Sequence, residues 1–532
     1  MAATNSTTRR NFLAAAGTLL STGYASQVIA DESDSLHNEA IAIRDRRELF
    51  VDSYLIHGLR GAAQQKLHHP IPDDLVLVHD APWEGTGSGY HSVFHDGERY
   101  RMYYKAWHLD LTSGKLNTTR HPLYCCYAES SDGISWHKPN LGLHNFAGST
   151  ANNITIVSGR HGPLNVDAGH PAVFLDDRPD AAPEARFKAI LRSRKPNGLL
   201  PFRSADGFHW EPMTNAPILH DQGAFDSQNL AFWDSHTGQY RAYWRTFTDG
   251  VTDDTRWQPS GLRAIRTSTS DDLISWAPPI DLTYDGSPPE QLYTNQVKPY
   301  HRAPHLLIGF PTRYIDRGWS PSMRALPAED RRKLRSAASP RYGTALTDAL
   351  FMTSRNGTDF HRWNEAFLRP GPERPGTWNY GHQYIGWHVV ETRSSQTGAA
   401  NELSLYATES YWHGKGSAVR RYTLRLDGFV SVHGPAAEDS ELITKVMTFE
   451  GAQMHLNFST SAAGAIRVEV QRPDGVALKN YSLDDFDELF GDSTDRVVSW
   501  RGRSDLSPIL GRPVRLRIQL RDADLYSLQF HS

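Results

Sequence analysis

The sequence predicts an all-β protein, a five-bladed β-propeller followed by a C-terminal β-sandwich. Three observations lead to this prediction. A Ser-x-Asp-Gly-x-x-Trp pattern recurs along the chain, a strand–turn–strand pattern opens five times, and both patterns stop near Val432. Regular repetition of one supersecondary unit predicts a radial or stacked architecture, and short antiparallel strands favour the radial one.

The first pattern occupies residues 130–136, 204–210 and 270–276, with a degraded copy at 354–360. Its copies lie on the order of 70 residues apart, more than a WD-type blade of about 40–45 residues needs. The Asp-Gly pair suits a tight turn, and the following Trp can cover the edge of a sheet.

The second pattern is an apolar-alternating strand, a turn and an aromatic-rich strand. It opens near residues 91, 170, 228, 295 and 382. Five such units predict five blades over residues 40–432. Helical periodicity is nearly absent, and a short surface helix is expected only over Pro327–Ser336, which has Pro at its first position.

After Val432 the blade pattern ends. Four segments then read as strands broken by Gly- and Pro-containing turns. A compact antiparallel sandwich is therefore expected over residues 433–532, a common domain size. The four predicted strands are residues 444–458, 465–471, 496–501 and 513–530.

The first 30 residues have the features of an export signal. Arg9 and Arg10 precede a short apolar run, and Val28-Ile29-Ala30 offers small residues for cleavage. This arrangement resembles a twin-arginine signal peptide, and the apolar run is too short to remain as a membrane anchor. We therefore expect a periplasmic or extracellular protein with no membrane anchor after cleavage.

Charge and cysteine content narrow the function further. The formal net charge is −4, so clustered positive charge for nucleic acid is not expected. Cys125 and Cys126 are adjacent, which disfavours a mutual disulfide or a metal site and suggests packing on opposite faces of a strand. The 14 Trp, 22 Tyr and 25 His residues would suit a sugar site, although most aromatic rings are expected in the sheet core.

Five segments carry a resemblance to a known family: residues 48–56, 82–85, 223–229, 311–314 and 521–527. In these the chain resembles exported bacterial proteins described only as similar to glycoside hydrolase family 32. A propeller followed by a sandwich is similar to the invertase-type enzymes of that family, and the propeller alone is similar to families 43, 62, 68 and 117. The resemblance implies a fold and a carbohydrate partner more firmly than an activity.

The chain departs from family 32 in its motifs. The Asn-Asp-Pro, Arg-Asp-Pro and Glu-Cys strings that carry catalysis in that family do not occur here. Cleavage of sucrose or fructan is therefore not supported, and no catalytic residue is carried over.

Glycosidic cleavage commonly needs two facing carboxyl groups. Asp226 precedes an apolar strand and Glu409 ends one beside two aromatic residues, so these two are the expected pair. Glu84, before a Gly-rich stretch, and Asp348 are further catalytic candidates. The structural alternatives are a turn cap for Asp226, a strand-end ion pair for Glu409 and a linker position for Glu84.

Polar residues at the five openings should line the central funnel and bind substrate. Arg313 would position an anionic or hydroxyl-rich group, and Trp378 would cover a sugar face. The expected binding residues are His91, His170, Gln228, Asn229, Asn295, Gln296, Arg313, Trp378 and His382. No metal or cofactor is expected, although three of these histidines could hold Zn²⁺ or assist Ca²⁺ if they converged.

The favoured hypothesis is an exported glycoside hydrolase that cleaves a poly- or oligosaccharide with a carboxylate pair in the funnel. The alternative is a non-catalytic carbohydrate-binding propeller. A sialidase-like or lyase-type enzyme is a third hypothesis without a supporting motif. The sequence leaves the oligomeric state open.

Overall fold

The computed structural model describes residues 40–110, 115, 117, 120–413 and 416–531. The predicted signal peptide, residues 1–30, lies outside them. None of the helices in the described part of the chain is long and apolar enough to cross a membrane.

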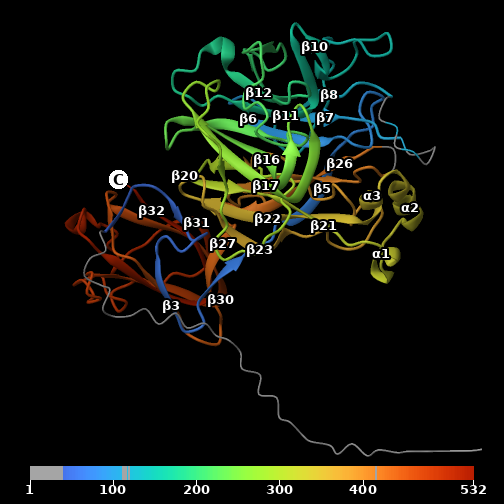
Figure 1. The fold of residues 1–532 in the computed structure, drawn as a ribbon. Coiled ribbons are helices and arrows are strands. Elements are labelled where there is room, and N and C mark those ends of the chain that lie inside the picture. Colours follow the sequence, from blue (N-terminus) through green and yellow to red (C-terminus); the bar gives the residue numbers. More distant parts are fainter. Residues whose placement is uncertain (1–39, 111–114, 116, 118–119, 414–415, 532) are drawn as a thin grey trace, which may run out of the picture. The chain divides into compact units, whose positions relative to one another are not determined.

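Five separate antiparallel sheets form the five blades, which confirms the predicted propeller (Figure 1). Blade 1 contains β6 (Gly89–His95), β7 (Tyr100–Ala106), β8 (Tyr124–Ser130) and β9 (Ile154–Val157). Blade 2 contains β10 (Gly159–His161), β11 (Leu164–Leu175), β12 (Phe187–Ser193), β13 (Gly198–Ser204) and β14 (Glu211–Pro212). Blade 3 contains β15 (Leu230–Asp234), β16 (Gln239–Thr252), β17 (Trp257–Ser270) and β18 (Ile280–Asp281).

Blade 4 contains β19 (Lys298–Tyr300), β20 (Ala303–Gly309), β21 (Thr312–Asp316), β22 (Ala345–Ser354) and β23 (His361–Leu368). Blade 5 contains β24 (Val390–Thr392), β25 (Glu402–Glu409) and β26 (Ala418–Arg425), and its outer strand is β5 (Ile71–Val78). A strand from the start of the described chain therefore closes the ring by pairing with β26.

The helices lie in blade 4, between β21 and β22. They are α1 (Pro321–Ala325), α2 (Glu329–Ala338) and α3 (Pro340–Thr344), of which α2 corresponds to the predicted surface helix. In the described residues, 3₁₀ turns occur at Pro183–Ala185 and Ser507–Ile509.

The recurring Asp-Gly-Trp pattern forms a loop that joins neighbouring blades. In the first copy Asp132 accepts hydrogen bonds from the backbone N–H groups of Ile134 and Ser135, which closes the turn. The Gly carbonyl of three copies accepts a hydrogen bond from a tyrosine of the preceding blade in the ring. These pairs are Tyr406 with Gly133, Tyr103 with Gly207, and Tyr243 with Gly357. The repeat is thus a contact between blades as well as a turn.

The two cysteines lie on β8 and are free. Cys125 packs in the apolar cluster shared with blade 2, and Cys126 packs in the cluster shared with blade 5. Their predicted placement on opposite faces of a strand is confirmed.

The C-terminal β-domain does not consist only of the residues after the expected boundary between 432 and 433. Its eight-stranded sheet includes N-terminal strands, so residues 41–67 pair here and not in the blades (Figure 1). The sheet contains β2 (Glu48–Leu49), β3 (Ile56–Arg60), β4 (Gln64–Leu67), β27 (Val430–Gly434), β28 (Ser440–Thr444), β30 (Gln453–Gln471), β31 (Asp492–Val497) and β32 (Arg515–His531). A separate two-stranded sheet pairs β1 (Ile41–Arg44) with β29 (Met447–Phe449).

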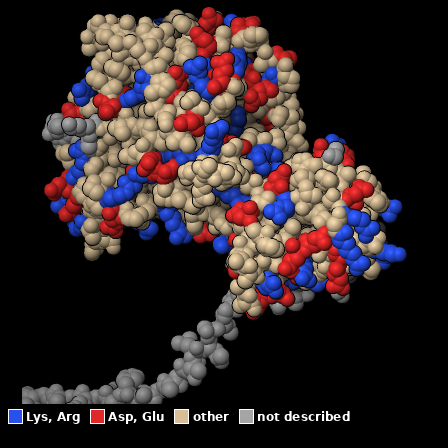
Figure 2. Space-filling model, turned by 180° about the vertical axis from the view of Figure 1, so that it is seen from behind, with Lys and Arg blue, Asp and Glu red and all other residues tan. Residues whose placement is uncertain are grey.

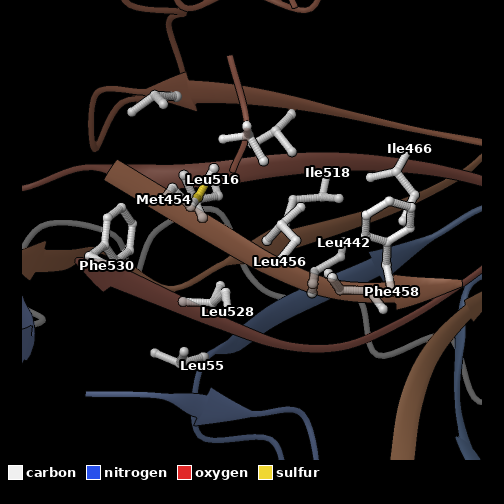
Figure 3. Close-up of a cluster of buried hydrophobic side chains, with 14 of the residues drawn as sticks. Leu55, Leu442, Met454, Leu456, Phe458, Ile466, Leu516, Ile518, Leu528 and Phe530 are labelled. Atoms are coloured by element: carbon white, nitrogen blue, oxygen red, sulfur yellow. The ribbon is translucent and has the colours of Figure 1, made fainter. Parts of the chain in front are cut away.

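These strands share one apolar core, part of which Figure 3 shows. Leu456 and Ile466 of β30 and Leu528 of β32 lie in it, together with Leu55 from the N-terminal segment. The N-terminal residues therefore complete the core, and the domain needs both ends of the described chain.

A buried carboxylate, that of Asp427, links the propeller to this domain. Asp427 is fully buried and precedes β27. It accepts hydrogen bonds of 2.8–3.2 Å from five side chains: Arg47, Tyr300, Arg302, Asn457 and Ser527. Because the two arginines and their hydrogen bonds outweigh burial, they hold the pKa of Asp427 below its usual range.

Replacing Asp427 should therefore destabilise the protein strongly. Asp427→Ala leaves two buried guanidinium groups without their carboxylate, a change that costs about 3–5 kcal/mol of unfolding free energy. Asp474→Ala, at an exposed hairpin, is the matched control and should change stability by less than about 0.5 kcal/mol. Urea unfolding of both variants checks this, and equal stability of the two would contradict it.

Candidate functional site

The central axis of the propeller is crossed by two buried glutamine side chains. Gln228 donates hydrogen bonds to the carbonyls of Tyr90 (3.0 Å) and Pro171 (2.9 Å). Gln296 donates to the side-chain oxygen of Gln228 at 2.8 Å. These two residues, expected to line a funnel, join blades 1 to 4 across the axis. Trp387 of blade 5 is fully buried beside them and donates to Val297 O at 2.9 Å.

A tyrosine cluster lies at the end of the axis where the inner strands begin. It draws its rings from blades 1, 4 and 5, and its members are Tyr90, Tyr293, Tyr314, Tyr380, Tyr384, Tyr411 and Trp412. The Tyr384 ring centroid lies 6.1 Å from that of Tyr90 and 5.6 Å from that of Tyr293. The hydroxyl groups of Tyr380 and Tyr293 are hydrogen-bonded at 2.8 Å. The Tyr384 hydroxyl is buried and has no hydrogen-bond partner in the described residues.

Lys105, at the end of β7, places an amino group among these rings. Its Nζ lies 4.4 Å from the Tyr90 ring centroid and 5.0 Å from that of Trp107, and it donates to the Tyr411 hydroxyl at 3.0 Å. Burial lowers the pKa of Lys105 to about 7, because the charged form loses its hydration. This amino group therefore changes charge near neutral pH.

Three arginines surround Tyr293 and its neighbours. The guanidinium carbon of Arg245 lies 4.8 Å from the Tyr293 ring centroid, and that of Arg263 lies 5.5 Å from it. Arg341 lies 5.8 Å from the Tyr380 ring. Burial acts to raise the pKa of Tyr293, but the arginines outweigh it and lower the pKa to about 8. Arg263 and Arg341 form no ion pair with a carboxylate of the described residues.

Two carboxylates accompany these cations. Asp226, with 40% of its side chain exposed, forms an ion pair with Arg245. Asp167 is fully buried, lies 3.3 Å from His170 Nδ1 and 2.9 Å from Arg194 Nε, and is 3.9 Å from Arg192. His170 in turn lies 5.6 Å from the Tyr90 ring, and burial lowers its pKa to about 4.

We call this set the Tyr–Arg site. It comprises the tyrosine cluster with Lys105, Asp167, His170, Arg192, Asp226, Arg245, Arg263 and Arg341. Four arginines and Lys105 face two carboxylates, so the site has an excess of positive charge, which increases below about pH 7 as Lys105 becomes protonated. Over the face in Figure 2, by contrast, acidic and basic side chains are interspersed.

Glu409 lies in a buried ion-pair network. Arg374 and Arg420 hold its carboxylate, and Arg420 Nε donates to it at 2.7 Å. Burial opposes ionisation, but the two arginines lower the pKa of Glu409 to about 2. The carboxylate is therefore ionised at neutral pH, which does not suit a proton donor.

The other two predicted acids also have structural partners. Glu84 is buried and contacts Lys138 Nζ at 2.8 Å and the Tyr104 hydroxyl, and burial raises its pKa. Asp348 of β22 pairs with Arg313 of β21, with Nη2–Oδ2 at 2.7 Å. The Arg313 side chain therefore links β21 to β22 within blade 4, and its other partners, Glu290 and Asn364 O, also lie outside the Tyr–Arg site.

The remaining predicted binding residues support loops. Asn229 donates to Phe225 O at 3.1 Å and to Ser227 O at 2.7 Å. Asn295 accepts from Val297 N at 3.3 Å. The indole of Trp378 donates to Gly371 O, and its backbone N–H donates to His382 Nδ1.

The three histidines considered for a metal do not converge. His91 Nε2 lies 3.2 Å from His79 Nε2, His170 pairs with Asp167, and His382 binds the Trp378 backbone. Two other groups in the described chain bring metal-ligating atoms close together, and neither contains these residues: His455, Asp495 and His531, and His220, Asp221 and Asp254.

The sequence contains a pattern that marks two basic residues of the site, Lys105 and Arg245, which were not among the predicted site residues. Lys105 follows Tyr103-Tyr104 in β7, and Arg245 follows Tyr243-Trp244 in β16, so both occupy the same place in the repeated aromatic strand. A basic residue directly after an aromatic pair in two blades marks this end of the axis. Tyr384 likewise lies within the fifth predicted opening.

No family model and no curated protein matches the chain. Among solved structures it is similar to a family 43 arabinoxylan arabinofuranohydrolase from Bacillus subtilis, solved with cellotetraose. The identity is 12%, with 87% of this chain and 99% of that chain covered, and the TM-score is 0.38. A glycosyl hydrolase from Bacteroides ovatus gives 15% identity, coverage of 66% and 93%, and a TM-score of 0.38.

An N-acetylgalactosamine deacetylase from F. plautii, solved with blood group B trisaccharide, is also similar. It gives 13% identity, coverage of 69% of this chain and 94% of that chain, and a TM-score of 0.38. At these identities and scores, no residue role or activity is transferred. The fold established by the strand pairing is the five-bladed β-propeller.

The Glu409 network should make stability depend on acid pH. Because the folded-state pKa is lowered from 4.5 to about 2, the stabilisation is complete above pH 4.5 and is lost as pH falls toward 2. The loss amounts to about 3 kcal/mol at most. Glu409→Gln should lack this part of the acid dependence, whereas Glu488→Gln, at an exposed ion pair, should keep it. Urea unfolding across that pH range tests it, and parallel pH profiles for wild type and Glu409→Gln would contradict it.

Proposed function

We propose that the protein is a carbohydrate-active enzyme that binds an acidic saccharide at the Tyr–Arg site and cleaves one of its glycosidic bonds. One observation carries the proposal. Four arginines and Lys105 surround the tyrosine cluster, and two carboxylates are too few to neutralise their positive charge. Arg263 and Arg341 have no carboxylate partner in the described residues.

The residue types fit an anionic sugar. Aromatic rings pack against the apolar C–H faces of a sugar ring, while tyrosine hydroxyls exchange hydrogen bonds with its hydroxyl groups. A planar guanidinium binds a carboxylate through two parallel N–H groups. Arg263 and Arg341 are partly exposed, so they are available at the rim of the site.

Tyr293 supports a route to cleavage other than two carboxyl groups. Most glycosidases use such a pair, but sialidases use a tyrosine nucleophile. With a pKa of about 8, Tyr293 ionises more readily than an ordinary phenol, which favours a role as nucleophile or base. Tyrosinate Oη of Tyr293 would form a bond to the anomeric carbon as the glycosidic C–O bond breaks, and protonated Asp226, the more exposed carboxylate, would donate its proton to the leaving oxygen. The resulting Asp226 carboxylate would then take a proton from a water molecule that cleaves the glycosyl–tyrosine bond and releases Tyr293. This chemistry favours the sialidase-like hypothesis over the Asp226–Glu409 pair.

A non-catalytic binding propeller is the second candidate. The specific observation in its favour is the burial of Tyr293, which is only 6% exposed. A ligand could bind to the arginines at the rim without reaching the phenol. Export through the twin-arginine pathway is part of both proposals.

Turnover tests the first proposal. The protein should release reducing sugar from polygalacturonate, alginate or glucuronoxylan and little from arabinan. Tyr293→Phe should reduce kcat at least about 100-fold, the order lost with a proton-transfer group, while Arg263→Met mainly raises KM. Tyr481→Phe, in the C-terminal β-domain, is the matched control and should leave both constants unchanged.

The outcomes separate the candidates. Binding of acidic saccharides without turnover, lost in Arg263→Met, would support the binding propeller. A preference for the neutral polysaccharide, or an active Tyr293→Phe enzyme, would contradict the acidic-sugar enzyme.

Affinity should also depend on pH through Lys105. Below pH 7 its ammonium group attracts an anionic ligand, and this attraction is lost as pH rises through about 7. Titration of trigalacturonate by calorimetry should show weaker binding above that pH. Lys105→Met should weaken binding at low pH and flatten the profile, while Lys333→Met on α2 should retain it. A profile identical in wild type and Lys105→Met would contradict the assignment.

A further inference from the structure

A cavity of about 450 Å³ lies at the opposite end of the axis from the Tyr–Arg site. Strand β6 begins beside Tyr90 of the site, and its last residue, His95, lines the cavity. The last residue of β11, Leu175, lines it too. Gln296, also in its wall, donates to Gln228 and thereby separates the two ends. We call this space the strand-end cavity.

Two polar groups in its wall lack partners. The Oε1 atom of Gln296 is buried and has no hydrogen-bond partner in the described residues. Two residues further along the chain, Lys298 Nζ forms no hydrogen bond or ion pair within the described residues. It lies 5.5 Å from the ring centroid of Phe232 and 5.7 Å from that of Trp387. The cavity therefore offers one unpaired acceptor and one unpaired donor close together in the chain.

This combination selects for a hydroxyl group. A hydroxyl can accept a hydrogen bond from Lys298 and donate one to Gln296, whereas a carboxylate can only accept. Since an unpaired buried polar group is costly, a ligand hydroxyl would satisfy both groups at once.

The other walls suit the body of a sugar. Phe94, Tyr100 and Phe310 supply aromatic surface, against which C–H faces pack. The volume lies within the range of about 300–1,000 Å³ that is usual for small-molecule sites.

Charge distinguishes this cavity from the Tyr–Arg site. Asp177 and Glu391 line it together with Lys298. The carboxylate of Glu391 accepts from Asn401 at 2.9 Å and lies 3.5 Å from His301 Nε2. Carboxylates therefore offset the lysine, and the walls carry no excess of positive charge. An anionic sugar would be disfavoured.

We propose that the strand-end cavity is a second saccharide site, which binds a neutral sugar of one or two residues. The proposal rests on the cavity's own groups and is independent of catalysis at the Tyr–Arg site.

Calorimetric titration of the full chain with cellobiose, xylobiose, galactose and galacturonate tests it. At least one neutral sugar should bind saturably and more tightly than galacturonate. Lys298→Met should weaken that binding about tenfold or more, the effect of removing a charge-assisted hydrogen bond. Val389→Trp is a second variant that keeps the lysine. Its larger side chain should fill the cavity from the partly exposed wall and so weaken the same binding.

Arg263→Met at the Tyr–Arg site and Lys333→Met on α2 are the controls, and both should bind the neutral sugar as the wild type does. Failure of all three neutral sugars to bind would overturn the proposal, as would tighter binding of galacturonate that depends on Lys298. A third result would also overturn it: the neutral sugar binds, Arg263→Met abolishes this binding, and Lys298→Met and Val389→Trp leave it intact. Loss of turnover in Tyr293→Phe bears only on the Tyr–Arg site.

Discussion

The pairing of β5 with β26 closes the ring, and the rest of the propeller depends on it. Without β5, the outer edge of β26 in blade 5 would be unpaired, and such edges are prone to association. Closure brings blades 5 and 1 together, where Val93 N donates to Trp387 O at 2.9 Å and Trp387 N donates to His91 O at 2.7 Å. The tyrosine cluster draws on blades 1, 4 and 5, so its geometry exists only in the closed ring. The glutamine pair across the axis has the same requirement.

Much of the fold could be predicted because its signals are local. The Ser-x-Asp-Gly sequence specifies a turn through contacts within four residues, and strand alternation is visible in short windows. The position of residues 41–67 could not be predicted, because it depends on pairing with strands far along the chain. Nor could β30 be predicted as one strand, since irregular pairing between Thr460 and Ala465 interrupts its alternation.

The candidate site was predicted less completely. Polar residues at the inner strands indicated the axis correctly, but Gln228 and Gln296 bind each other there. Asp226 and His170 do lie at the Tyr–Arg site. Glu409 resembles a catalytic group because it is an acid at the end of an apolar strand, but no local pattern in the sequence indicates the two arginines that neutralise it. The arginines around Tyr293 come from three separate strands or helices, so no local pattern joins them.

The interleaving of the chain's two ends in the C-terminal β-domain has a consequence for biosynthesis. Arg47 contacts Ser527, 480 residues later. During translation the early strands leave the ribosome long before their partners exist, and they must remain unpaired until synthesis is nearly complete. The high contact order this creates slows folding and leaves exposed strand edges for that interval. Folding of this domain must therefore be largely post-translational, and the early strands are natural sites for a chaperone to protect.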